Sequence, residues 1–99
     1  MLNIEKQTNA SELTVSLTGR LDTTTAPDLE KQLKAGIDGV TMLVIDMEKL
    51  EYISSAGLRV LLSAQKLMDK QGEMKVTHVN ETIMEIFEIT GFADILTIE

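Results

Sequence analysis

Two adjacent serines are the residues of this chain best placed to do chemistry. Ser54 and Ser55 stand between an apolar run, residues 42–45, and a long helical pattern that begins near Ala56. A serine at a helix start accepts a hydrogen bond from backbone N–H groups that have no partner within the helix. A phosphate is also well tolerated there, because those N–H groups and the helix dipole favour negative charge. The pair therefore predicts a helix cap or a phosphorylation site.

Catalysis is the alternative use of these hydroxyl groups. Ser55 could act as a nucleophile with His78 as its base, and Asp46 would then orient the imidazole. The chain lacks the Gly-x-Ser-x-Gly pattern of a nucleophile elbow, a phosphate loop of the Walker type and the spacing of a metal site. A domain of 99 residues also leaves little volume for a substrate pocket. We therefore predict that the protein is not an enzyme and needs no cofactor and no metal.

The first half of the chain is expected to form a hairpin and a helix. Apolar and polar residues alternate over residues 13–18, the period of a half-buried strand, and more weakly over residues 2–4. The turn-like residues 7–11 indicate that these two strands pair as a hairpin. A helix with Thr25 as its cap follows, and it ends in the glycine-containing stretch that starts at Gly36.

The second half is expected to alternate strand, helix, strand and helix. Residues 42–45 are apolar without alternation, which is typical of a central strand covered on both faces. The helix that starts at the serines ends at Gly72 and a strand begins at Met74, so this span forms a βαβ unit. Asn80 caps a last helix, with Gly91 just past its end. A short closing strand is predicted from the apolar residues Ile95, Leu96 and Ile98.

Together these elements predict an α/β fold with the candidate residues at one edge. We expect a single domain over residues 1–99, with a mixed β-sheet of about four to five strands and helices packed on it. In such sheets the functional edge lies at the carboxyl ends of the parallel strands. Asp46, at the end of the central strand, should lie there with Ser54 and Ser55. Asp22, which follows an antiparallel strand and precedes the first helix, is predicted to reach the same rim.

The charged residues of this region also have purely structural interpretations. Asp22 among threonines is typical of a turn or a cap. Asp46 at a strand end can accept hydrogen bonds from a loop, and Lys49 and Arg59 are typical of solvated surface charges. His78 is typical of a histidine in a loop or at a strand end.

Composition and charge narrow the class of partner. The formal net charge is −7, which argues against direct binding of nucleic acid and fits a protein partner that offers basic groups. The chain has no cysteine, so disulfides and thiolate metal sites are excluded. It shows no signal-like leader and no apolar run near the roughly 20 residues that span a bilayer. We therefore expect a cytoplasmic protein that is not inserted in a membrane.

Three segments carry a resemblance to a known family. Gly19-Arg20-Leu21-Asp22, the strand from Met42 to Asp46 and, most specifically, Tyr52-Ile53-Ser54-Ser55-Ala56-Gly57-Leu58-Arg59 resemble the STAS domain of bacterial anti-sigma factor antagonists. The similarity extends over essentially the whole chain and includes Thr90-Gly91-Phe92. The resemblance implies binding to an anti-sigma factor that is also a serine kinase, which frees the sigma factor. It also implies that phosphorylation in this loop ends binding and that a phosphatase of the PP2C type resets the protein.

One position departs from a common form of the family pattern. In that form, Asp-Ser-Ser-Gly or Asp-Ser-Thr-Gly, the modified hydroxyl directly precedes the glycine. Here Ala56 precedes Gly57 and has no hydroxyl. Ser55 is therefore the predicted phosphorylation site, with Ser54 as the alternative. The departure also leaves open a scaffold subunit that is not phosphorylated, because similar domains serve in transport and stress-signalling complexes.

The predicted partner-binding surface combines the serine segment with the two acidic segments. Its residues are Asp22, Thr23, Thr24, Thr25, Asp46, Lys49, Ser54, Ser55, Gly57, Leu58 and Arg59. Phosphorylation is expected to block this surface without changing the fold, because the first-turn amides of the helix can donate to the phosphate oxygens.

Overall fold

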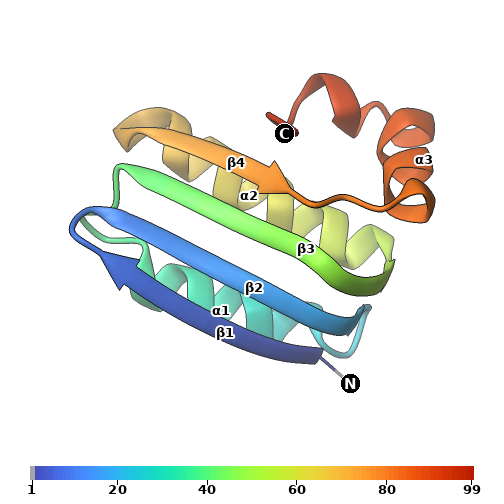
Figure 1. Ribbon diagram of the computed structural model, residues 1–99, viewed down its shortest axis with the longest axis horizontal. Coiled ribbons are helices and arrows are strands. Elements are labelled where there is room, and N and C mark those ends of the chain that lie inside the picture. Colours follow the sequence, from blue (N-terminus) through green and yellow to red (C-terminus); the bar gives the residue numbers. More distant parts are fainter. Residues whose placement is uncertain (1) are drawn as a thin grey trace.

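Strands and helices alternate along most of the chain (Figure 1). The computed structural model describes residues 2–99. Its elements are β1 (Leu2–Asn9), β2 (Glu12–Leu21), α1 (Ala26–Gly36), β3 (Met42–Ile53), α2 (Ser55–Gln71), β4 (Glu73–Thr77), α3 (Glu81–Thr90) and the 3₁₀ turn η1 (Phe92–Asp94). The result is a small α/β domain with a four-stranded mixed sheet, as the sequence predicted. No helix within residues 2–99 is both long and apolar enough to cross a bilayer.

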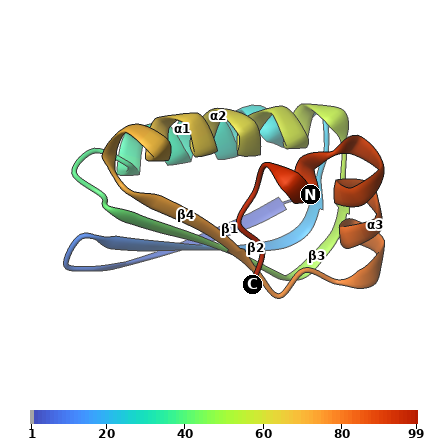
Figure 2. The same ribbon diagram turned by 90° about the horizontal axis from the view of Figure 1, so that it is seen from above.

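Helices α1 and α2 cover the same side of the sheet (Figure 2). The strand order is β1-β2-β3-β4, with β1 antiparallel to β2 and the other three strands parallel. Helix α1 connects β2 to β3, and α2 connects β3 to β4. Both connections advance in the same direction across the sheet. Because such crossovers are right-handed in nearly all proteins, both helices must lie on one face.

The hydrophobic core lies between this covered face and the two helices. It includes Leu43 of β3, Leu29 of α1 and Leu61 of α2, all fully buried. The intervening strand residue Val44 is only half-buried, because its side chain points to the face that carries no helix. The prediction that residues 42–45 are covered on both faces is therefore wrong.

Strand β3 is much longer than the predicted strand and contains a bulge. Asp46 pairs with Ser16 of β2, but the next pair joins Lys49 to Thr18, so β3 holds one extra residue here. The Oδ1 atom of Asp46 accepts the backbone N–H of Glu48 at 3.0 Å and so supports the bulge. Asp46 consequently lies inside β3 and does not end it, which corrects the sequence prediction.

Helix α3 lies beside the outer part of β3, where the shorter strand β4 has already ended (Figure 1). The side chain of Asn80 holds α3 in this position through two hydrogen bonds. Its Oδ1 accepts the N–H of Ile83 at 2.9 Å, which confirms the predicted cap, and its Nδ2 donates to the carbonyl of Leu50 at 2.9 Å. Ile83 and Phe87, the buried residues of α3, are fully excluded from solvent.

The chain after α3 does not form the predicted closing strand. It makes the turn η1 first, and only Ile98 forms a bridge with Val76 of β4. Leu96 is buried, and its N–H donates to the carbonyl of Phe92 at 2.9 Å. Because the N–H groups of Ile95 and Leu96 both donate back to the carbonyl of Phe92, these two residues do not pair with β4, and the chain meets β4 at a single position.

Candidate functional site

The loop after β2 and the start of α2 leave the sheet side by side. The backbone N–H of Ser54 donates to the carbonyl of Leu21 at 2.9 Å, which continues the pairing of β2 and β3 by one residue. Asp22 follows Leu21 directly, so its loop lies next to the serines. The predicted proximity of these two segments therefore holds.

The two serines have different roles at the start of α2. Ser54 is the N-cap: its backbone is extended, and its Oγ accepts the N–H of Gly57 at 3.3 Å. Ser55 is the first helical residue and is exposed, and its hydroxyl makes no hydrogen bond within residues 2–99. The first turn carries no acidic side chain. A negative group on Ser55 would therefore meet no carboxylate of its own helical turn.

Gly57 and Leu58 belong to the core and not to the surface. Both are buried, and a Cβ atom on Gly57 would come within 2.7 Å of Leu21 Cγ and 2.9 Å of Ile53 Cγ1. Glycine thus allows α2 to start close to the ends of β2 and β3. This corrects the prediction that these two residues contact a partner. Arg59, the next residue, is exposed.

The loop between β2 and α1 is organised around the carboxylate of Asp22. Its Oδ1 accepts the hydroxyl of Thr24 at 2.7 Å and the backbone N–H groups of Thr24 and Thr25 at 3.0 and 3.1 Å. Thr25 occupies the N-cap position of α1, but its side chain does not cap the helix. Its hydroxyl instead donates to the carbonyl of Arg20 at 2.9 Å. Thr23 and Thr24 are exposed at the tip of the loop.

These hydrogen bonds lower the pKa of the Asp22 carboxyl group. The hydroxyl of Thr24 contributes most, and the N–H groups of Thr25 and Thr24 contribute further, so the pKa of Asp22 lies below its ordinary value of 3.8, although desolvation opposes the shift. The carboxylate is therefore charged at neutral pH and holds the loop in one conformation.

We expect Asp22→Asn to lower the melting temperature at neutral pH and to reduce the loss of stability on acidification. A carboxylate with a lowered pKa stabilises the folded state above its ordinary pKa of 3.8, and this contribution is lost as the pH falls through the lowered value. The difference in melting temperature from wild type should be widest near pH 7 and narrow below about pH 4. Asp38→Asn, in the exposed loop after α1, is the charge-matched control. A difference that is constant with pH would contradict a role for the ionised carboxylate.

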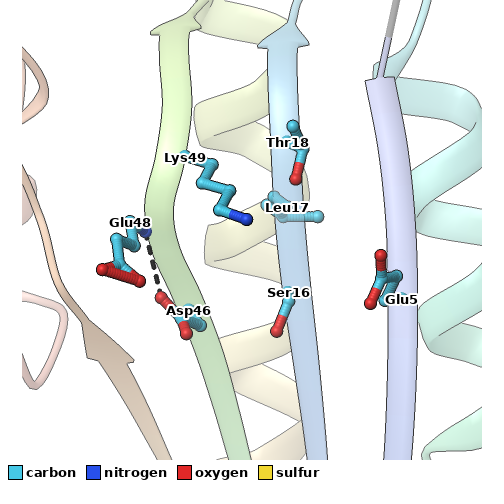
Figure 3. A pocket seen from close by; sticks show the side chains of 7 residues that line it. All are labelled: Glu5, Ser16, Leu17, Thr18, Asp46, Glu48 and Lys49. Carbon is cyan, nitrogen blue, oxygen red and sulfur yellow. Dashed lines mark hydrogen bonds between the residues drawn. The ribbon is translucent and has the colours of Figure 1, made fainter.

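Asp46 and Lys49 lie on the open face of the sheet, away from the serines. They line a shallow hollow of about 170 Å³ together with Glu5, Ser16, Leu17, Thr18 and Glu48. Figure 3 shows these side chains on β1, β2 and β3. Asp46 precedes Ser54 by eight positions, and strands rise about 3.3 Å per residue, so roughly 20–26 Å separate their Cα atoms, the lower value allowing for the two register shifts in β3. The structure therefore does not join Asp46 and Lys49 to the surface around Ser55.

His78 contacts Asp46 and does not approach Ser55. Its Nδ1 atom is 3.0 Å from Asp46 Oδ1, and its backbone has a positive φ of 56°. Strand β4 ends opposite Asp46, whereas Ser55 follows the far end of β3. The residues considered for a serine–histidine pair are thus separated. Within residues 2–99 no group of three or more acidic, histidine or cysteine side chains is arranged to hold a metal ion.

Comparison with known proteins identifies the family. The model of the STAS domain matches residues 2–99. The chain belongs to the STAS domain family. BtrV of Bordetella bronchiseptica, described as an anti-sigma factor antagonist, is 41% identical to this STAS domain over 88 residues, which cover 87% of this chain and 76% of BtrV. The anti-sigma-B factor antagonist of Bacillus subtilis is 30% identical over 98 residues, which cover 98% and 90% of the two chains.

A solved structure has the same fold. The crystal structure of an anti-sigma factor antagonist from Mycobacterium paratuberculosis matches this STAS domain with a TM-score of 0.90 at 24% identity, over 99% of this chain and 85% of that one. The two structures therefore share the sheet and its helices.

The surface of this STAS domain beside the serines also contains Arg20 and Tyr52, which the sequence analysis did not select. They are neighbours across β2 and β3, and the guanidinium of Arg20 lies 4.4 Å from the centre of the Tyr52 ring. Arg20 Nε is also 3.9 Å from Asp22 Oδ2. Tyr52 remains 37% exposed. Only the register of β2 against β3 pairs these residues, so spacing along the chain could not reveal them.

Proposed function

We propose that this STAS domain is an anti-sigma factor antagonist regulated by phosphorylation. The unmodified form binds an anti-sigma factor that is also a serine kinase, and the sigma factor is released. The kinase phosphorylates Ser55, which ends binding, and a phosphatase of the PP2C type restores the unmodified form. The observation that carries this proposal is the exposed hydroxyl at the first position of α2, in a chain whose relatives are named anti-sigma factor antagonists.

The two serines are not equivalent as phosphate acceptors. The Ser54 hydroxyl accepts the N–H of Gly57 and is half-buried, so its modification would disturb the helix start. The Ser55 hydroxyl is exposed and engaged in no hydrogen bond within residues 2–99, so a kinase can reach it without local unfolding. These differences favour Ser55 and leave Ser54 as the alternative acceptor.

The proposed docking surface is the rim around Ser55. It consists of Arg20, Asp22, Thr23, Thr24, Thr25, Tyr52, Ser54, Ser55 and Arg59. Tyrosine and arginine are among the side chains that most often dominate binding energy at protein interfaces. Because Arg20 is held by Tyr52 and by Asp22, less side-chain entropy is lost when a partner binds.

Phosphorylation is proposed to act on this surface and not on the fold. A phosphate adds about −1.5 to −2 charges beside the ionised Asp22. A partner shaped around a hydroxyl must then desolvate a strongly hydrated anion, which is unfavourable without a compensating cation. The role is therefore one of binding in the cytoplasm, where sigma factors act, and the domain itself performs no catalysis.

Phosphate mapping tests the proposal. The protein would be incubated with ATP and the serine kinase anti-sigma factor of the same genome, and the products analysed by tandem mass spectrometry. We expect one phosphate on Ser55 in the wild type and in Ser54→Ala, and none in Ser55→Ala. Phosphate on Ser54 would support the alternative acceptor. Complete absence of modification, together with stable co-purification of transporter or stress-complex subunits, would support the scaffold function instead.

A further inference from the structure

Arg59 lies one helical turn after Ser55 on the outer surface of α2. Both residues are exposed, and residues four apart on a helix are neighbours on its surface. Helical side chains lean towards the N-terminus, so a side chain as long as that of Arg59 can reach back over the turn that carries Ser55. An anion followed four residues later by a cation is also the more favourable order of such a pair.

Arg59 is available for this contact. It has no salt-bridge partner within residues 2–99, whereas Arg20 at the same rim is held by Tyr52 and Asp22. The next cation along α2 is Lys66, about 16 Å from Ser55 along the helix axis. Arg59 is therefore the cation of α2 that a phosphate on Ser55 can reach.

We propose that Arg59 binds the phosphate of phosphorylated Ser55 and is thereby withdrawn from the docking surface. This inference rests on the proposed function, because it assumes that Ser55 is the residue modified. Arginine and phosphate form paired, charge-assisted hydrogen bonds in a fixed geometry. Modification then changes the rim twice: it adds a dianion, and it removes the guanidinium that a partner would meet one turn after Ser55. A partner therefore loses its contact with Arg59 in addition to meeting the phosphate.

Other charges face the same phosphate and must be considered. The Asp22 carboxylate, on the loop beside the serines, disfavours the dianion, and Arg20 at the end of β2 is already engaged with that carboxylate. Both are present in every variant at position 59. A comparison among such variants therefore isolates the contribution of Arg59.

A titration of the phosphate tests this contact directly. Phosphoserine would be incorporated at position 55 during synthesis, and its pKa followed by ³¹P NMR at low ionic strength. The second pKa of a free phosphoserine is about 6. We expect Arg59→Gln to raise the pKa of the phosphoserine by about half a unit above that of the protein with Arg59, because the dianion loses its partner. In Arg59→Lys the pKa of the phosphoserine should lie between those of Arg59→Gln and of the protein with Arg59. In Lys66→Gln it should equal that of the protein with Arg59.

The outcome of this titration does not depend on the kinase or on any partner. If the phosphate has the same pKa in folded Arg59→Gln as in the protein that retains Arg59, the contact is overturned, whatever residue the kinase modifies. Modification of a residue other than Ser55 or Ser54 would overturn the proposed function and leave the titration unchanged. In unmodified protein, Arg59→Gln is further expected to weaken anti-sigma factor binding severalfold, and unchanged binding would overturn the withdrawal of Arg59 from the docking surface.

Discussion

Ser55→Glu is expected to weaken binding of the anti-sigma factor by about a hundredfold, equivalent to about 2.8 kcal/mol. The carboxylate places a charge at the centre of the proposed docking surface, where the partner offers a site for a hydroxyl. It must lose its hydration on binding, and the neighbouring Asp22 carboxylate adds to the local negative charge. Ser55→Ala removes a hydroxyl that makes no hydrogen bond within residues 2–99, so it should bind within a few-fold of wild type and resist inactivation by the kinase. Isothermal titration calorimetry measures both affinities.

Thr82→Glu is the matched control for this experiment. Thr82 is exposed in the first turn of α3, so the variant adds the same charge at the start of another helix. It should leave binding unchanged. Affinity of Ser55→Glu within threefold of wild type, or an equal loss in Thr82→Glu, would show that the rim around Ser55 is not where the partner binds.

Gly72→Ala is expected to lower the free energy of unfolding by about 3 kcal/mol or more. Gly72 ends α2, and a Cβ atom there would overlap the carbonyl oxygen and carbon of Thr41 in the segment before β3. The same carbonyl accepts the N–H of Glu73 at 2.9 Å, so the backbone cannot move away without breaking the start of β4. The reason for glycine is this close approach, since the φ of 172° is ordinary extended backbone. Urea denaturation measures the change.

Gly36→Ala provides the contrast for that measurement. A Cβ atom on Gly36 would meet Leu13 Cδ2 at 3.6 Å, an ordinary contact, and the residue is the last of a helix. The substitution should be neutral or stabilise by up to about 1 kcal/mol, because alanine loses less conformational entropy on folding. A similar loss of stability in the two variants would mean that the contact with Thr41 is not the cause.

The order and ends of most elements follow from local sequence. Alternation over residues 13–18 predicted a half-buried strand, and the observed strand β2 includes all of these residues. Asn80 and Gly91 predicted the limits of α3, because a side-chain acceptor and a residue with positive φ satisfy the backbone groups at helix ends. Ser54 and Ser55 were recognised for the same reason, since the start of α2 exposes unpaired N–H groups whatever the rest of the fold.

Which residues make up the site could not be predicted in the same way, because it depends on pairing between strands that are distant in the sequence. Strand β3 continues to pair with β2 past Asp46 as far as Ile53, and the extra residue at the bulge places Asp46 and Lys49, three positions apart, on the same open face. The register of β2 against β3 brings Arg20 over Tyr52, and nothing in their separation along the chain indicates it.

Thus the sequence by itself determined the α/β pattern, the helix caps and an exposed hydroxyl at the start of the second helix, because each depends on backbone groups and side chains a few residues apart. The tertiary structure alone decided which charged residues share a surface with Ser55, and that Gly57 and Leu58 are buried beneath it. Those properties depend on strand register, strand length and the face on which the right-handed crossovers place the helices.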